Sequence, residues 1–395
     1  MITDLTNATF TYLPIFGYGV AHWGIYIIRK FSSLNYKRYT QEYHATTSVI
    51  IPVYKEKPQI LKKVLDSILR NKPNEIITVI DHSDDENITV SKSYKQVKTI
   101  ITPFPGKRHA LATGITHAKG EIVVLVDSDT MWLGNTFLTE ILKPFNDSSV
   151  GGVGSRQNVY RAESSWRKRF VDWMLDTKYL DYVPSMSNHG VVTCLSGRTA
   201  AYRRKAVVPS LSRLVNEKFL GKQCVGGDDV RLTSLVLEKG YKTVYQDSAR
   251  AVTYFSGSIT SYLGQKVRWS RNSYRGYTRA IGEGLAFRRG WMYLLSIYHC
   301  LLPGLTYLLF TGFLVYSLVI GDWLLFAFLS AWAVLSRMIK SISHLRRRYS
   351  DIVLLPFVAF YYTVPLTLIK IYSLLTVRHE KWSGSRKGYK LSERQ

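Results

Sequence analysis

The chain has 395 residues, enough for one sizeable α/β domain and additional segments, because single domains usually contain about 100 to 200 residues. Lys and Arg together number 53 and Asp and Glu 28, so the chain favours anionic partners: phosphorylated substrates, anionic lipid headgroups or nucleic acid. The three cysteines, Cys194, Cys224 and Cys300, are far apart, which excludes a disulfide framework or a Cys-x-x-Cys site and favours a reduced, cytosol-facing domain.

The N-terminal region contains the first long apolar segment. Residues Leu5 to Ile28 include no Asp, Glu, Lys or Arg, and about 20 such residues cross a bilayer core of roughly 30 Å. Basic residues follow this segment at 29–38, whereas a cleaved signal peptide has them in front. By the positive-inside rule the N-terminus is outside and the following domain is cytoplasmic. We therefore expect a membrane helix and a basic linker over residues 1–45.

Residues 46–255 have the pattern of a soluble α/β domain. The strands are continuous apolar runs rich in β-branched residues, such as Ser48 to Val53, which is typical of buried strands in a parallel sheet. The expected elements are strands at 48–53, 75–81, 97–102 and 121–127, and helices from Pro58, over 107–118 and near 135–145. This alternation predicts a doubly wound, mostly parallel sheet that binds ligands at the carboxyl ends of its strands.

Two carboxylates, Asp127 and Asp129, stand at the end of the fourth strand. Side chains two positions apart in an extended chain point to the same face, so both carboxylates project together. Oxygen ligands suit Mg²⁺ or Mn²⁺, which would in turn hold a substrate diphosphate. An Asp-x-Asp triplet also occurs in solvated turns, and its position at a strand end is what favours a metal site.

A basic turn leads into the helix at 107–118. Gly106, Lys107 and Arg108 place backbone donors and side-chain cations at the start of that helix, where they favour a phosphate group. A capped helix with exposed basic residues fits the same pattern, so both interpretations stay open.

A second acidic pair, Asp228 and Asp229, follows Gly226 and Gly227 and precedes an apolar helical pattern. Acidic residues at a helix start complement the helix dipole, which is one interpretation. If this pair faces the first one, a carboxylate of it serves instead as a general base that deprotonates an acceptor hydroxyl.

A cationic stripe follows in the next helical segment. Gln265, Arg268 and Trp269 open it, and Arg268, Arg271, Arg275 and Arg279 recur at helical spacing. One interpretation is an amphipathic helix on anionic headgroups over residues 256–290. The other adds a Trp platform for a sugar ring and an Arg near phosphate.

Three apolar segments near the C-terminus predict further membrane spans within residues 291–377. They are Trp291 to Gly321, Trp323 to Ser336 and Ile352 to Ile369. The basic stretch 337–348 and the tail 378–395 favour the cytoplasm, but four full spans would place both termini outside. Pro356 and Pro365 offer a solution, because a broken last segment that protein covers can be re-entrant or interfacial.

Taken in order, these motifs resemble the processive family-2 inverting glycosyltransferases, the group that includes hyaluronan, cellulose and type 3 capsular polysaccharide synthases. The resemblance covers roughly residues 47–386. It rests on SVIIPVYKE, TPFPGKRHAL, VLVDSDTMW, CLSGRTAAYRR, GGDDVRLT with KGYKTVYQD, and QKVRW. It implies a GT-A-like fold flanked by transmembrane helices.

The resemblance also implies a role for each matching residue. Asp127 and Asp129 would hold the metal and UDP, and Asp229 would be the catalytic base, with Asp228 beside it. Donor or UDP contacts would come from Tyr54, Asp81, Lys107 and Arg108, and acceptor or diphosphate contacts from Cys194, Gly197, Arg198, Gln265, Arg268, Trp269 and Arg386. Two positions depart from the family pattern: Asp81 is not part of an acidic pair, and Trp382 and Arg386 are one residue further apart than in a Trp-x-x-Arg tail.

The sequence thus predicts a multi-pass enzyme of the plasma membrane that polymerises sugars from UDP-sugar donors and exports the growing polysaccharide. A transferase that adds one sugar to a lipid-linked isoprenoid phosphate is the alternative within the same fold. A basic scaffold or nucleic-acid binder is the alternative outside it, and the lack of an aromatic RNP-like strand motif argues against that class. The identity of the sugar stays open.

Overall fold

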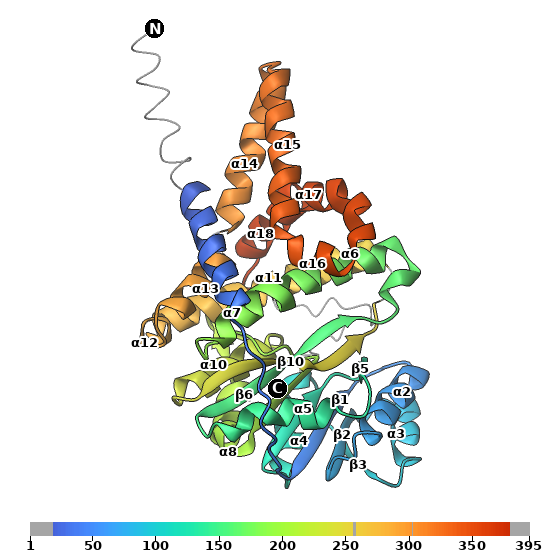
Figure 1. Ribbon diagram of the computed structural model, residues 1–395. Helices are drawn as coiled ribbons and strands as arrows, with labels where there is room; N and C mark the ends of the chain where they lie inside the picture. Colours follow the sequence, from blue (N-terminus) through green and yellow to red (C-terminus); the bar gives the residue numbers. More distant parts are fainter. Residues whose placement is uncertain (1–18, 256–257, 302, 380–395) are drawn as a thin grey trace.

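The computed structural model describes residues 19–255, 258–301 and 303–379. An α/β domain forms one end of the molecule and a group of apolar helices forms the other (Figure 1). Helices α6 (Trp166–Asp176) and α11 (Ile259–Gly282) lie between the two parts. The functional residues predicted from the sequence fall in the α/β domain and in α11.

A single eight-stranded sheet, in the order β3-β2-β1-β4-β7-β6-β10-β5, forms the centre of the α/β domain. The strands are β1 (Thr47–Val53), β2 (Glu75–Asp81), β3 (Val97–Thr102), β4 (Ile122–Val126), β5 (Thr130–Trp132), β6 (Val150–Val159), β7 (Thr199–Arg203) and β10 (Lys242–Thr253). The first four in that order are parallel, as predicted. Strand β7 runs antiparallel to β4 and β6, and β5 antiparallel to β10, which the sequence did not indicate.

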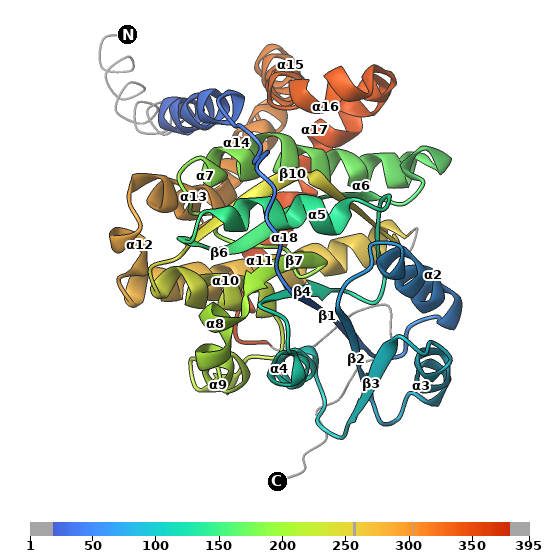
Figure 2. The same cartoon turned by 60° about the horizontal axis from the view of Figure 1, so that its bottom comes forward.

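Alternating side chains of the parallel strands bury both faces of the sheet. In β1, Val49 and Ile51 belong to the core under α2 (Pro58–Leu69) and α5 (Phe137–Leu142). Ile50 belongs to the opposite core, under α4 (Lys107–His117) and α10 (Asp228–Glu238). Figure 2 shows α4 on one side of β1–β3 and α2 with α3 (Asp85–Lys92) on the other. A two-layer covering of this kind explains why these strands are continuously apolar.

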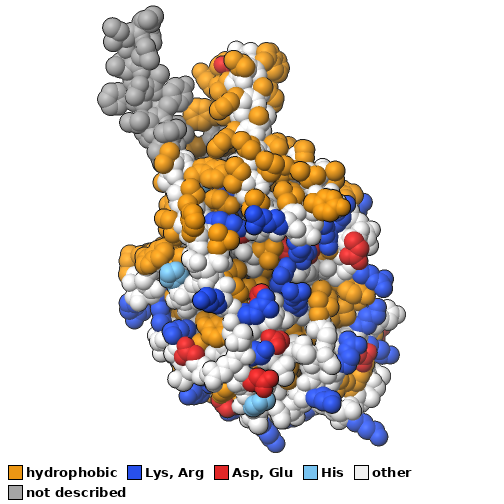
Figure 3. All heavy atoms as spheres, in the orientation of Figure 1, with side chains coloured by type: hydrophobic (Ala, Val, Ile, Leu, Met, Phe, Trp, Pro, Cys, Tyr) orange, Lys and Arg blue, Asp and Glu red, His pale blue; other side chains and the backbone are white. Residues whose placement is uncertain are grey.

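The apolar helices contain three segments that are long and apolar enough to cross a membrane: Trp291–Val319, Trp323–Lys340 and Tyr349–Leu375. They correspond to helices α13 (Trp291–Leu301) with α14 (Pro303–Val319), α15 (Trp323–Lys340), and α17 (Leu355–Thr363) with α18 (Pro365–Leu375). Hydrophobic side chains cover this part of the surface, and charged side chains collect below it (Figure 3). Of the predicted first span, residues 19–28 belong to a helix over 19–34, and the rest lies outside the described residues.

The last apolar segment is broken at Val364 and Pro365, because proline cannot donate the hydrogen bond that would continue the helix. Helix α17 has 9 residues and α18 has 11, so neither alone spans a bilayer core of roughly 30 Å. Helix α18 packs on α11, where Ser373 Oγ donates to Val267 O at 3.3 Å and Arg271 Nε to Thr376 Oγ1 at 3.1 Å. The helix is thus interrupted at the second of the two prolines, and protein covers one side of the second half.

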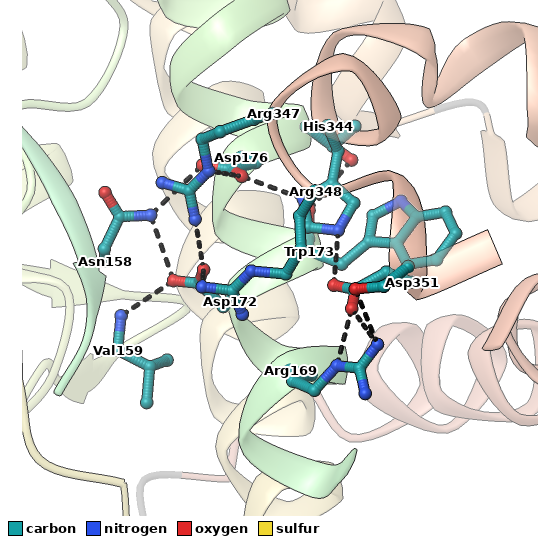
Figure 4. Close-up of polar contacts among 12 residues, drawn as sticks. Asn158, Val159, Arg169, Asp172, Trp173, Asp176, His344, Arg347, Arg348 and Asp351 are labelled. Carbon is teal, nitrogen blue, oxygen red and sulfur yellow. Dashed lines mark hydrogen bonds and ion pairs between the residues drawn. The ribbon is translucent and has the colours of Figure 1, made fainter. Parts of the chain in front are cut away.

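A buried polar network joins the membrane helices to α6 (Figure 4). His344, in α16 (Ile342–Arg347), stacks on Trp173 and lies 2.8 Å from both Asp176 Oδ2 and Asp351 Oδ2. Both ring nitrogens of His344 are thus engaged by carboxylates. Arg347 adds a contact to Asp176 at 2.9 Å. The network therefore fixes α16 against the helix that carries Trp173.

Replacement of His344 by leucine is expected to lower the free energy of unfolding by about 1 to 3 kcal/mol, because two buried carboxylates lose their contacts with the ring, although Arg347 and Arg169 remain beside them. Thermal melting of the purified protein in detergent measures this loss. His117→Leu, at an exposed position of α4, is the matched control. Equal melting temperatures for both variants would show that the network contributes nothing to stability.

Candidate active site

The candidate site begins at one edge of the sheet, where three parallel strands end. Tyr54 follows β1, Asp81 ends β2 and Asp127 follows β4, and the parallel pairing brings these ends together. All three residues line one cavity of about 540 Å³. Asp81 Oδ1 accepts hydrogen bonds from Ser83 N at 3.0 Å and Ser83 Oγ at 2.7 Å, which fix its orientation. The carboxyl ends of these strands thus place polar side chains along one border of the cavity.

The antiparallel strand β7 delivers a second segment to this edge. Val126 pairs with Thr199, so the residues before β7 reach the end of β4. The backbone N–H of Asp127 donates to Arg198 O at 2.8 Å. Cys194, Gly197 and Arg198 accordingly line the same cavity.

Lys107 connects the two acidic pairs from the first turn of α4. Its Nζ lies 2.7 Å from Asp127 Oδ1 and 3.1 Å from Asp228 Oδ2. Burial opposes the charge of Lys107, but these carboxylates outweigh it and raise the pKa of the ammonium. A Cβ at Gly197 would lie 2.9 Å from Lys107 Nζ, so a larger residue there would displace the ammonium. The two acidic pairs therefore face each other across Lys107, which is the arrangement that the general-base interpretation needs.

Asp127 and Asp129 form a pair of carboxylates in which Lys107 contacts Asp127. Burial raises the pKa of Asp127 to about 6, and the nearby Asp129 adds to the rise while Lys107 opposes it. The described residues bring together no set of three or more His, Cys, Asp or Glu side chains that could hold a metal ion. Two carboxylates suffice for Mg²⁺ or Mn²⁺ when substrate phosphates and water complete the shell. The residues present therefore fit a metal that arrives with a phosphorylated ligand.

Asp229 lies beside Asp228 in the first turn of α10 and faces the segment before β7. Its Oδ2 accepts from Gly197 N at 3.3 Å, and its Oδ1 accepts from Val230 N at 2.9 Å. Burial raises the pKa of the Cys194 thiol, and the neighbouring Asp229 adds to this effect. Asp229 is thus oriented by backbone donors and open to the cavity, as a general base requires.

Helix α11 closes the cavity opposite the sheet edge. Gln265, Arg268 and Trp269 line it. Burial lowers the pKa of Arg268, while Asp127, Asp228 and Asp229 oppose the lowering, so the guanidinium faces the acids. The Trp269 ring lies 5.4 Å from the Arg198 guanidinium and 5.3 Å from Lys266 Nζ. Both acidic pairs and the α11 residues therefore share one chamber.

The cationic stripe of α11 makes contacts with protein over much of its length, and its contact with anionic headgroups stays a prediction. Arg271 and Arg275 are buried, and Arg279 forms ion pairs with Glu217 and Glu283. The helical spacing was read correctly, but the described residues supply acidic and backbone partners that the sequence pattern could not locate.

Arg108 points away from the cavity that Lys107 enters. Its guanidinium lies 2.5 Å from Glu217 and donates to Leu214 O at 2.7 Å and to Gly226 O at 2.6 Å. Adjacent residues of a helix point about 100° apart, so two neighbouring cations cannot both face one ligand. Arg108 therefore does not line the cavity, although the resemblance implied a donor contact for it. It supports the turn that precedes Asp228 instead.

Arg108→Met is expected to lower the free energy of unfolding by about 1 to 3 kcal/mol, because it leaves the buried carbonyls of Leu214 and Gly226 without this donor, while Glu217 keeps Arg231 and Arg279. Thermal melting in detergent measures the change, and titration with UDP measures donor affinity in the folded protein. Unchanged melting combined with lost UDP affinity would return Arg108 to the donor site.

The residues that line the cavity include polar side chains to which the sequence assigned no role, among them Lys178, Lys266, Asn272 and His379. Lys266 lies inside a quoted motif, and Asn272 follows Arg268 by one helical turn, so helical spacing could have indicated it. Lys178 lies in a π-helical turn, Thr177–Tyr182, for which the sequence gives no signal. Arg386 lies outside the described residues.

The amino-acid sequence is similar to known glycosyltransferases. Residues 44–272 match the family model described as "Glycosyltransferase like family 2". Hyaluronan synthase of Streptococcus pyogenes is 27% identical over 400 residues, which cover 95% of this chain and 94% of that protein. An N-acetylglucosaminyltransferase of Rhizobium sp. (strain N33) is 29% identical, and the match covers 58% of this chain and 53% of that protein.

A solved structure has a similar fold. The mannosyltransferase of Pyrobaculum calidifontis in complex with GDP-Man and Mn²⁺ superposes with a TM-score of 0.61 at 19% identity. The match covers 89% of this chain and 97% of that one. This likeness confirms the predicted GT-A-like fold with its mostly parallel sheet.

Proposed function

This chain belongs to the glycosyltransferase-like family 2, and from that premise we propose that it polymerises sugars from UDP-sugar donors and exports the polysaccharide through its own membrane helices. It is a membrane-embedded, processive glycosyltransferase that resembles hyaluronan synthase over almost its whole length. The observation that carries the proposal is the single cavity that both acidic pairs share with residues of the membrane helices.

The donor side of the cavity lies at the sheet edge. Tyr54 and Asp81, at the ends of β1 and β2, would hold the nucleoside. Lys107 and Arg268 face the carboxylates and would stabilise the negative charge that collects on the departing UDP. Asp127 and Asp129 would hold Mg²⁺ or Mn²⁺, which when bound neutralises the diphosphate as a Lewis acid.

The acceptor side lies between Asp229 and α11. Asp229 would take the proton from the acceptor hydroxyl as its oxygen forms a bond with the anomeric carbon. The bond from that carbon to the diphosphate breaks on the opposite face, so the configuration inverts and UDP leaves. Backbone donors from Gly197 and Val230 hold the carboxylate in place during this step.

The exit is formed by residues on three helices beyond the acceptor side. Arg29 of the helix over 19–34, Tyr182, and His299 with Cys300 of α13 line the same cavity as Asp229. His299 and Cys300 belong to the first candidate membrane segment. The product would therefore pass directly from the catalytic base to the membrane helices, with the catalytic domain on the cytoplasmic side of the plasma membrane.

A donor screen tests this proposal. The purified full-length protein is incubated with Mn²⁺ or Mg²⁺ and with UDP-glucose, UDP-glucuronate or UDP-N-acetylglucosamine, singly and in pairs, and UDP release is measured. We expect UDP release from at least one donor or pair and its loss in EDTA. Absence of UDP release from every donor and pair would refute the proposed function.

A further inference from the structure

Glu217 is a buried carboxylate beside the active site, between α9 (Leu211–Val215) and β8 (Lys218–Phe219). Its Oε2 lies 2.5 Å from Arg108 Nη2 and its Oε1 3.3 Å from Arg231 Nε, and Arg279 pairs with Oε1 as well. We call these four residues the Glu217 cluster. They do not line the active-site cavity, but border a separate cavity of about 10 Å³, which has room for about one water molecule and for no substrate.

Each arginine of the Glu217 cluster comes from a helix that also carries an active-site residue. The pairs are Lys107 and Arg108 in α4, Asp229 and Arg231 in α10, and Arg268 and Arg279 in α11. These three helices are separate in the sequence and approach the cavity from different directions. The carboxylate of Glu217 therefore joins the three helices that supply the cation Lys107, the acid Asp229 and the residues of α11 to one chamber.

Close packing connects the Glu217 cluster to the start of α10. A Cβ at Gly276 of α11 would overlap Val230 Cγ1, so α10 and α11 are in direct contact beside the cluster. Arg108 donates to Gly226 O at 2.6 Å, in the turn that precedes the second acidic pair. Close-packed protein interiors have low compressibility and transmit strain. The position of Asp229 in the first turn of α10 therefore depends on the contacts that hold this cluster together.

Stability alone does not explain one buried carboxylate with three cations. The desolvation of buried charges offsets much of their attraction, so apolar residues of similar volume often stabilise a fold equally well. Each arginine also has a second partner: Leu214 O for Arg108, Glu238 for Arg231 and Lys218 O for Arg279. What Glu217 adds to these contacts is a single fixed point that the three helices share.

We propose that Glu217 is a positioning residue, which fixes Asp229 relative to Lys107 and to α11 for the transfer of the sugar. This inference rests on the proposed function and concerns the transfer step in that same site. A displacement of the reacting groups by about 1 Å can cost roughly a hundredfold in rate. Tyr54 and Asp81, which the proposed function assigns to the nucleoside, belong to strand ends and not to these helices. A change at Glu217 therefore impairs transfer and preserves UDP binding.

Glu217→Gln, with Glu217→Asp as the conservative variant, tests this role in the full-length protein. The amide keeps the size of the side chain and removes its charge. We expect kcat, measured as UDP release at saturating donor, to fall about ten- to a hundredfold, while the affinity for UDP with Mn²⁺ stays that of the wild type. Glu217→Asp should recover part of the loss. Arg213→Gln is the control, because Arg213 is half-exposed in α9 and pairs with Glu238 at 2.8 Å, and it should match wild type in both measurements.

Arg279→Gln is a second test, and it leaves the carboxylate of Glu217 in place. This change releases α11 from the Glu217 cluster, while Arg108 and Arg231 still neutralise the carboxylate. We expect the same pattern, a fall in kcat at unchanged affinity for UDP. Thermal melting in detergent shows whether each variant is folded. If Glu217→Gln does not fold, the result for Arg279→Gln decides between a positioning role and none.

Two results would overturn the positioning role of Glu217. One is a kcat of wild-type size in either folded variant. The other is an equal loss of kcat and of UDP affinity, which is the result of a general disturbance of the site. Failure of the proposed function is recognised separately, because the wild-type protein would then release UDP from no donor, and this inference would fall with it. Normal UDP release by the wild type and by the folded variants would refute the positioning role alone.

Discussion

Asp229→Asn is expected to reduce sugar transfer by about 10²- to 10⁴-fold, the range that a positioned general base contributes. The amide matches the carboxylate in size, and its oxygen still accepts the bond that Gly197 N donates. It cannot take the proton of the acceptor hydroxyl. The effect should therefore fall on kcat, because a base acts in the transition state more than in ground-state binding.

Two measurements on the same preparation check this expectation. UDP release at saturating donor gives kcat, and calorimetric titration gives the affinity for UDP with Mn²⁺. Asp85→Asn, an exposed carboxylate in the first turn of α3, is the control and should match wild type in both. A parallel fall of UDP affinity in Asp229→Asn would place this residue in the donor site instead.

Asp129→Ala is expected to remove metal-dependent donor binding. Loss of one carboxylate removes a charge-assisted contact of about 1.5 to 3 kcal/mol, which corresponds to roughly ten- to a hundredfold in affinity. Asp127 remains, but its carboxyl is only partly exposed beside Lys107 and gives the metal a single protein ligand.

Titration with UDP in the presence of Mn²⁺ and in EDTA measures this effect. In the wild type EDTA should weaken UDP binding, and in Asp129→Ala the two titrations should coincide. Asp129→Glu, which keeps the carboxylate, should restore part of the difference. EDTA-sensitive binding of wild-type strength in Asp129→Ala would exclude Asp129 as a metal ligand.

The sequence predicted the parallel half of the sheet well, because its strands are buried on both faces and read as unbroken apolar runs. Strand β6 escaped prediction for a physical reason. Its segment Val150–Val159 contains glycines at 151, 152 and 154, and a Cβ at Gly151 would lie 2.5 Å from Tyr241. Close packing requires residues without side chains there, and these remove the apolar pattern.

The site residues were predicted unevenly for a related reason. Asp127 and Asp229 belong to local motifs whose place in the fold, at a strand end and a helix start, follows from the sequence. The direction of a single side chain does not follow, so Lys107 and Arg108 could not be told apart. Lys178 lines the cavity from a π-helical turn that no local sequence pattern indicates.

Product size after incubation of the purified enzyme with labelled UDP-sugars tests the central claim most directly. The donor or donor pair that gives UDP release is used, and the products are separated by gel electrophoresis and by organic extraction. A processive enzyme with one chamber for donor, base and exit predicts long polysaccharide while most of the donor is still present. A product that carries a single sugar and enters the organic phase would contradict polymerisation and favour a lipid-linked transferase.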